Sequence, residues 1–228
     1  MSFLGLEPGF TLAIIVANVI LWLMLQSNRT LLDRMIFVYR SVARDREYDR
    51  LIASGFAHHS FFHLLFNMMT LYYFGPEVER LYGRLGFAVV YIASIVGGNL
   101  FTMVTHRNNL NYSALGASGG LFGVVFAFVW MKPDASLALF FIPVFIPGWL
   151  FGIIICWISI ILSQLPRAGE AGISHEGHLG GALSGALVAL LFHIPENART
   201  DQVAFLAGAI LPVIVFGIWK WLRLDRGK

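Results

Sequence analysis

The sequence predicts an all-α protein, a polytopic bundle of transmembrane helices, and three observations lead to this prediction. Hydrophobic residues make up 57% of the 228 residues and charged residues only 13%, whereas soluble domains average about 45–50% and about 25%. A helix needs roughly 20 residues to cross a bilayer core, and the chain contains seven apolar runs of suitable length. No Asp or Glu lies at the centre of any of these runs, as expected of helices that face lipid.

In chain order, the predicted spans cover residues 9–26, 57–75, 85–105, 115–131, 136–163, 177–194 and 203–222. The first begins without a basic residue and is not followed by a small-residue cleavage site, so we expect a retained span and not a cleaved signal peptide. Pro143 and Pro147 predict that the fifth span is kinked or begins as an irregular segment.

The longest predicted connection, residues 27–56, contains six arginines and four acidic residues. It is too long for a simple turn, so we expect a partly folded segment at the membrane surface. Together with this connection, the first six spans form one predicted core over residues 1–202. Residues 203–228 add a seventh, C-terminal helix with a basic tail.

Composition also limits the kinds of partner. The single cysteine, Cys156, lies inside an apolar run, so the chain cannot form an intrachain disulfide. The formal net charge of +3 is small and its charges lie in connections, which gives no support to nucleic-acid binding. The partner that composition does predict is the lipid bilayer.

The stretch "GASGG", residues 116–120, places a serine among small residues where the fourth span begins. Small residues let two membrane helices approach closely. Ser118 is therefore either one more small residue on a packing face or a nucleophile held between two helices. Gly116 and Gly119 flank it closely and support either interpretation.

The sixth span favours the nucleophile. In "EGHLGGALSG", Gly177, Gly181 and Gly185 recur every four residues and so lie on one stripe of the helix, with His178 beside the first. A serine needs a nearby base to take its proton, and imidazole is the usual base near neutral pH. Two glycine-faced helices could bring Ser118 and His178 together.

The same sequence predicts a catalytic pair and not a triad. The spans supply no acidic residue to orient His178, and Glu176, two residues away, projects from a different face of the helix. The soluble serine-hydrolase template, in contrast, uses a carboxylate as its third member. Packing would then have to orient the imidazole of His178.

The second span carries two further polar side chains. His63 and Asn67 are four residues apart and lie on one helical face inside an otherwise apolar segment. They could join two helices by hydrogen bonds, or they could donate hydrogen bonds to a developing oxyanion. The residues alone leave both roles open.

The histidines do not predict a metal site. In "HEGH", residues 175–178, the two histidines are three apart and lack the spacing of the H-E-x-x-H zinc motif. His59 and His63 have the right spacing, but no Glu follows His59. We therefore expect neither a metal nor another cofactor.

Taken in order, these motifs resemble those of the rhomboid intramembrane serine proteases. The matching residues are His63 and Asn67, the "GPEVERLYG" series Gly75, Glu79 and Gly83, the Gly116–Gly119 stretch around Ser118, and His178 with Gly181 and Gly185. The resemblance covers residues 8–195 and implies a rhomboid-like core of six helices, to which some members add a seventh.

The resemblance also implies residue roles. Ser118 is the implied nucleophile and His178 its general base, while His63, Asn67 and the Ser118 backbone N–H stabilise the oxyanion. The implied reaction is hydrolysis of peptide bonds in or beside transmembrane helices of protein substrates. Phe122 stands where many members have a tyrosine that stacks on the catalytic histidine, and Asp49 stands where many have tryptophan before Arg50.

Seven spans place the first, third and fifth connections on the same side of the membrane as the C-terminus. His63, Ser118 and His178 all lie near the beginnings of even-numbered spans, so we expect one shared site in a hydrophilic cavity open to that side. This side carries twelve Lys and Arg against four on the other, which indicates the cytoplasm. The resemblance implies the outer face instead, and we follow it, because the first connection is nearly balanced in charge.

The expected protein is thus a multi-pass protein of a cell membrane, and we expect a bacterial inner membrane.

Two alternatives belong to other functional classes. A proteolytically inactive rhomboid-like protein that binds membrane clients predicts loss of Ser118 or His178, and both are present. A transporter predicts broken helices or paired charges at mid-membrane, and the acidic residues are missing there.

Overall fold

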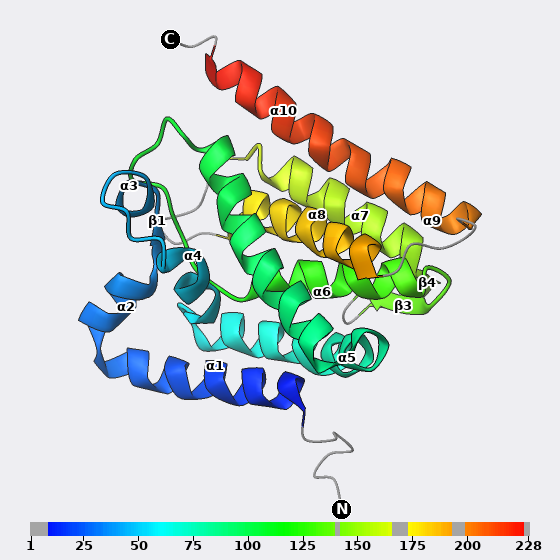
Figure 1. Cartoon of the computed structure of the whole chain (residues 1–228), viewed down its shortest axis with the longest axis horizontal. Coiled ribbons are helices and arrows are strands. Elements are labelled where there is room, and N and C mark those ends of the chain that lie inside the picture. Colours follow the sequence, from blue (N-terminus) through cyan, green and yellow to red (C-terminus); the bar gives the residue numbers. More distant parts are fainter. Residues whose placement is uncertain (1–8, 140–141, 166–172, 193–198, 226–228) are drawn as a thin grey trace, which may run out of the picture.

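The computed structural model describes residues 9–139, 142–165, 173–192 and 199–225. Within these residues helices form a bundle, accompanied by two short two-stranded sheets (Figure 1), which confirms the all-α prediction. The helices that correspond to the predicted spans are α1 (Phe10–Ser27), α5 (Phe61–Thr105), α6 (Ser118–Met131), α7 (Gly148–Leu162), α8 (His175–Phe192), and α9 (Thr200–Phe205), which continues through η3 (Leu206–Ile210) into α10 (Leu211–Asp225). The last two residues of the sixth predicted span, 193 and 194, lie outside the described residues.

Three helical stretches are long and apolar enough to cross a membrane, namely Phe10–Ser27, Phe61–Thr105 and Thr200–Leu224, and α6 and α7 are shorter apolar helices. With its 45 residues, α5 contains residues 61–75 of the second predicted span and the whole of the third, whereas residues 57–60 precede the helix. It is broken at Gly83, whose φ of 72° lies in the left-handed region that glycine adopts readily. The two halves of α5 can therefore run in different directions.

The first connection is folded, as predicted. It contains α2 (Arg29–Met35), β1 (Phe37–Val38), α3 (Tyr39–Ala43), α4 (Arg50–Ala53) and the 3₁₀ turn η2 (Ser54–Phe56). The buried Arg50 guanidinium holds it together by donating to the carbonyl oxygens of Asp33 at 2.6 Å and Ile36 at 2.7 Å, beside the carboxylate of Glu47. A guanidinium suits this place because it presents several donors in a fixed geometry.

The first connection meets the connection between α5 and α6. Strand β1 pairs antiparallel with β2 (Ser113–Ala114), with Phe37 opposite Ala114. In Figure 1, α2, α3, α4 and β1 gather beyond one end of the bundle. We call this end, made by residues 28–60 and 106–117, the loop end. The opposite end, made by the turn around Gly83 and residues 132–139 and 142–147, is the hairpin end.

The fifth predicted span is wrong over its first part. Strand β3 (Ser136–Leu139) pairs antiparallel with β4 (Ile142–Pro147), residues 140 and 141 lie outside the described residues, and the helix begins only at Gly148. Proline has no N–H to continue a helix, so Pro147 fits the boundary. The first free N–H groups of α7 bond back to the preceding segment, Gly148 to the Ala135 carbonyl at 2.8 Å and Trp149 to that of Pro133 at 2.9 Å.

Helix α8 lies in the centre and packs mainly on α5 and α6. The last helix covers it from the outside and contains a short π-helical segment, η3. The extra residue in such a turn frees a carbonyl, and the Trp157 indole N–H donates to the carbonyl of Gly208 at 3.1 Å. The C-terminal end of α10 reaches the loop end, where the Arg107 and Asn108 side chains donate to the carbonyls of Trp221 and Leu224.

Candidate active site

Ser118 is presented by a tight turn at the loop end. After β2 the chain passes Gly116, whose φ of 120° favours glycine, and α6 then begins at Ser118. The turn is tied to the first connection, because the Gly116 N–H donates to the Ser54 carbonyl at 2.8 Å. The next N–H, of Ala117, points to Nε2 of the buried His58 at 3.5 Å.

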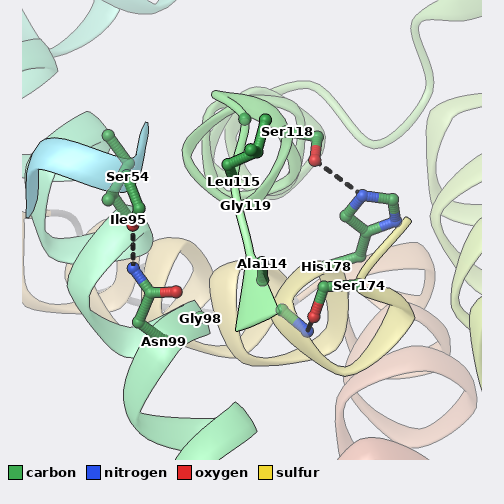
Figure 2. A pocket seen from close by; sticks show the side chains of 12 residues that line it. Ser54, Ile95, Gly98, Asn99, Ala114, Leu115, Ser118, Gly119, Ser174 and His178 are labelled. Atoms are coloured by element: carbon green, nitrogen blue, oxygen red, sulfur yellow. Dashed lines mark hydrogen bonds between the residues drawn. The ribbon is translucent and has the colours of Figure 1, made fainter. Parts of the chain in front are cut away.

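The structure brings together the two residues on which the sequence analysis centred. Nε2 of His178, in the first turn of α8, lies 2.8 Å from Oγ of Ser118, and Figure 2 shows this hydrogen bond across the pocket. The Phe122 ring stacks on the imidazole, with centroids 4.3 Å apart and planes 13° from parallel. Phe122 thus holds one face of the imidazole, and its ring offers no hydroxyl for a hydrogen bond.

Glycines allow α6 and α8 to approach this closely. A Cβ on Gly181 would overlap the carbonyl oxygen of Gly119, and a Cβ on Gly185 would overlap the backbone of Gly123 one turn further on. The stripe that the sequence predicted on α8 therefore faces a matching stripe on α6. Backbone contact of this kind is how small residues bring membrane helices together.

A small pocket with a volume of about 30 Å³ opens beside the pair. Polar side chains line it together with Ser118 and His178, namely Ser54, Asn99 and Ser174 (Figure 2). Asn99 also fixes the pocket wall, because its Nδ2 donates to Ser54 Oγ at 2.9 Å and to the Leu51 carbonyl at 2.8 Å. Such a lining can hold water beside Ser118.

His63 lies beside the turn before Ser118. It occupies the first turn of α5, which Ser60 caps by accepting from the His63 N–H at 3.2 Å. Its ring lies against Gly116, where a Cβ would be 2.5 Å from Cε1 and 2.6 Å from Nε2. His63 is therefore a neighbour of the backbone that carries Ser118.

Asn67 is buried one turn further along α5. Its Nδ2 has no hydrogen-bond partner in the part of the chain that the structure describes. An unpaired buried amide costs free energy unless a ligand satisfies it. This donor is therefore available to a bound group.

No carboxylate contacts His178 within the described residues. Glu176 is buried but points to His106 and Lys220, in agreement with the expectation that it projects from a different face. A search of the same residues finds no group of three or more His, Cys, Asp or Glu side chains that could hold a metal.

Sequence reasoning missed the position of His58 beside the Ala117 N–H. Its motif "HHSFFH" shows only that several histidines lie close in sequence, and no spacing rule connects position 58 with position 117. It also missed Ser174, which caps α8 by accepting from the Gly177 N–H at 3.1 Å. Here a signal exists, because serine before a helix is a preferred N-cap.

The exposed Asp49 lies outside the site, on the surface of the first connection. The Arg34 guanidinium pairs with it at 2.9 Å and lowers the pKa of the Asp49 carboxyl below its ordinary value. The neighbouring Arg50 is the residue that holds this connection together. The departure at position 49 is thus accommodated by a surface ion pair.

Comparison with known proteins gives a consistent result. The family model described as Rhomboid domain matches residues 45–195, which is well over half of the chain. The chain is 35% identical over 133 residues to the putative rhomboid protease YdcA of Bacillus subtilis, covering 57% of this chain and 65% of that protein.

Mitochondrial proteins are similar as well. Rhomboid protein 1, mitochondrial, of Saccharomyces cerevisiae is 32% identical over 60% of this chain and 40% of its own length. The human presenilin-associated rhomboid-like protein, mitochondrial, is 31% identical over 59% of this chain and 35% of its own. The matched part of the chain thus spans less than two thirds of the length of each relative.

Proposed function

This chain belongs to the rhomboid family, and we propose that it is an intramembrane serine endopeptidase that cleaves transmembrane segments of other membrane proteins with Ser118 and His178. One observation carries the proposal, the 2.8 Å hydrogen bond between Ser118 Oγ and His178 Nε2 beside a polar pocket. A nucleophile and a base within hydrogen-bond reach are the minimum for acyl transfer.

In the first step, His178 takes the hydroxyl proton while Ser118 Oγ attacks the carbonyl carbon of the substrate. The Gly119–Gly181 contact holds the two helices that carry these residues at a fixed distance, and Phe122 holds the imidazole plane. The rigid packing supplies the orientation that a carboxylate supplies in a triad. His178 then donates the proton to the departing amine.

Attack places a negative charge on the former carbonyl oxygen. Three donors surround the approach to Ser118 in this proposal, namely its own N–H, the His63 ring and the Asn67 amide. The unpaired Nδ2 of Asn67 supports the assignment, because a donor without a protein partner is ready to bind an oxyanion. Such preorganised donors cost no rearrangement when charge develops.

Water then hydrolyses the acyl-enzyme. It reaches Ser118 through the pocket lined by Ser54, Asn99 and Ser174, and His178 takes its proton as it attacks the ester. His178 then returns this proton to the Ser118 oxygen as the ester bond breaks, so the serine regains its hydroxyl and the acid product leaves. The histidine thus serves as base and then acid in each of the two half-reactions, with no cofactor.

The proposed substrates are membrane proteins, and the protein acts within a lipid bilayer. The relatives include mitochondrial proteins as well as one from a bacterium, so the expectation of a bacterial inner membrane is not supported and no particular membrane is proposed. The proposed domain division keeps residues 1–202 as the core and 203–228 as an added helix.

The test uses the purified full chain in detergent and in liposomes. Wild type should cleave a model transmembrane substrate and react with a fluorophosphonate probe, which labels activated serines. Ser118→Ala and His178→Ala should abolish both, while all variants keep the melting temperature of wild type within about 4 °C.

Ser159→Ala is the matched control, because Ser159 is also a buried serine but lies on α7. It should cleave and label as wild type does. Cleavage by Ser118→Ala at the wild-type rate would refute the proposal. Absence of cleavage and labelling in folded wild type would instead favour the inactive client-binding protein.

A further inference from the structure

We propose that Glu176 is a positioning residue, and that the C-terminal helix holds the first turn of α8 in place through Lys220, so that His178 stays within reach of Ser118. This rests on the proposed function and adds a part to it. Lys220 is also the one basic residue that intrudes into a predicted span, and the reaction described above does not use it.

Glu176 lies two residues before His178 in the same turn of α8. Its carboxylate is buried, with the side chain only 4% exposed. One oxygen, Oε1, lies 2.9 Å from Nε2 of His106, which follows α5, and 3.4 Å from Nζ of Lys220 on α10. Three elements far apart in sequence therefore meet at one carboxylate.

His106 connects this cluster to the cap of α8. Its ring stacks on Tyr112 with centroids 3.7 Å apart. The Tyr112 hydroxyl in turn lies 2.8 Å from Oγ of Ser174, whose own oxygens accept from the N–H groups of Gly177 and His178. Glu176 and Ser174 thus both secure the turn of α8 that carries His178.

The C-terminal helix is firmly placed at this point. Phe101 stacks on Phe216 with centroids 6.5 Å apart, and a Cβ on Gly217 would lie 2.8 Å from the Phe101 ring. Arg107 and Asn108 bind the last carbonyls of α10, as described above. Lys220 therefore lies on a helix that is fixed by packing and hydrogen bonds.

Because the Glu176 carboxylate is buried, losing one of its partners should displace it. Removing the lysine leaves the charge of Glu176 with one partner fewer in a low-dielectric interior, and such a group moves toward solvent or draws water in. The first turn of α8 moves with it. Because a displacement of about 1 Å at a reacting group can cost about a hundredfold in rate, even a small shift of His178 would be measurable.

The experiment compares Lys220→Met with Lys220→Arg in the full chain. We expect Lys220→Met to lower the rate of fluorophosphonate labelling about tenfold and to speed hydrogen exchange at residues 175–180. Lys220→Arg, which keeps the charge, should restore most of both. Glu176→Gln combined with Lys220→Met should lose less than the sum of the two single losses, because the pair acts as a unit.

Lys132→Met is the matched control. Lys132 pairs with Glu77 at 3.2 Å at the hairpin end, so the change removes a more exposed Lys–Glu pair far from His178. Labelling and exchange at residues 175–180 should both stay at wild-type values. Equal values in Lys220→Met and wild type would overturn the proposal.

Two further outcomes are distinguishable. If Lys220→Met does not fold, Glu176→Gln tests the same contact and leaves only the less buried charge of Lys220, and it should still speed exchange in the first turn of α8. If folded wild type does not label, the proposed function fails. Hydrogen exchange needs no reactive serine and still decides whether Lys220 holds that turn.

Discussion

The loop end and the hairpin end of the bundle differ in whether their buried polar groups have hydrogen-bond partners. At the loop end, Nδ2 of Asn67 and Nδ1 of His58 are buried without a hydrogen-bond partner among the described residues. At the hairpin end, Glu79 accepts from the N–H groups of Phe10 and Thr11 and from the Thr11 hydroxyl, all within 3.0 Å. There Gln202 also donates to the Trp130 carbonyl at 3.0 Å.

This difference separates two tasks. An unpaired buried donor such as the Asn67 amide lowers stability by about 1–3 kcal/mol, so its persistence fits a group that awaits a ligand. The carboxylate of Glu79 instead caps the start of α1, where the helix dipole and free N–H groups favour a negative charge. The hairpin end therefore contributes stability, and we propose that the loop end keeps the Asn67 amide available to a ligand.

The largest effect that tests this comparison is expected for Asn67→Leu. Loss of an oxyanion donor should lower the cleavage rate about 10²–10³-fold. The melting temperature should hold or rise slightly, because an apolar side chain of similar size removes the unpaired amide. Cleavage assays and thermal unfolding of the same preparation measure both.

Asn18→Leu is the control for that change. Asn18 is equally buried, but lies on α1, and its amide donates to the Ile14 carbonyl. Cleavage by this variant should match wild type. If Asn67→Leu unfolds readily and yet cleaves normally when folded, Asn67 stabilises the fold and does not take part in catalysis.

A smaller effect is expected for Glu79→Gln, which should change stability and not cleavage. The neutral amide accepts fewer hydrogen bonds at the start of α1, and the free energy of unfolding should fall by about 1–2 kcal/mol. Cleavage per folded molecule should not change. Chemical denaturation gives the first quantity and titration of labelled sites the second.

Glu77→Gln provides the comparison for Glu79. Among the described residues, the half-exposed Glu77 pairs only with the side chains of Arg80 and Lys132, so its loss should matter less to stability. A drop in cleavage by Glu79→Gln beyond its loss of folded protein would show that the two ends are not separate in function.

The smallest effect is expected for the surface pair Arg34–Asp49. Because Arg34 lowers the pKa of the Asp49 carboxyl, the pair stabilises the fold fully above the ordinary carboxyl pKa, about 4, and loses that contribution as the pH falls further. Asp49→Asn should leave cleavage unchanged and remove only this slight acid sensitivity of the melting temperature. A large loss of activity at neutral pH would assign the first connection a role in catalysis.

Much of this arrangement could be predicted from local patterns. Hydropathy located the helices, since a bilayer imposes their length and polarity. The four-residue recurrence of Gly177, Gly181 and Gly185 predicted a packing stripe, and the structure places His178 beside Ser118 as that stripe requires. The roles of His63 and Asn67 came from resemblance, and they remain predictions.

Other features depend on contacts that no spacing rule provides. Strands β3 and β4 are as apolar as a span, and only their pairing separates them from a helix. Glu176 was correctly judged to face away from His178, but its partners lie 70 residues earlier and 44 residues later. Single positions brought together by tertiary structure carry no periodic signal.

The contact between Gly119 and Gly181 has a consequence for anyone who surveys variants of this protein. Every side chain larger than a hydrogen atom at position 181 collides with the carbonyl oxygen of Gly119. A genetic screen should therefore score Gly181 as indispensable as Ser118, although it holds no reactive atom. In such a map Gly181 should rank among the most sensitive positions, because its lack of a Cβ is what lets the two helices meet.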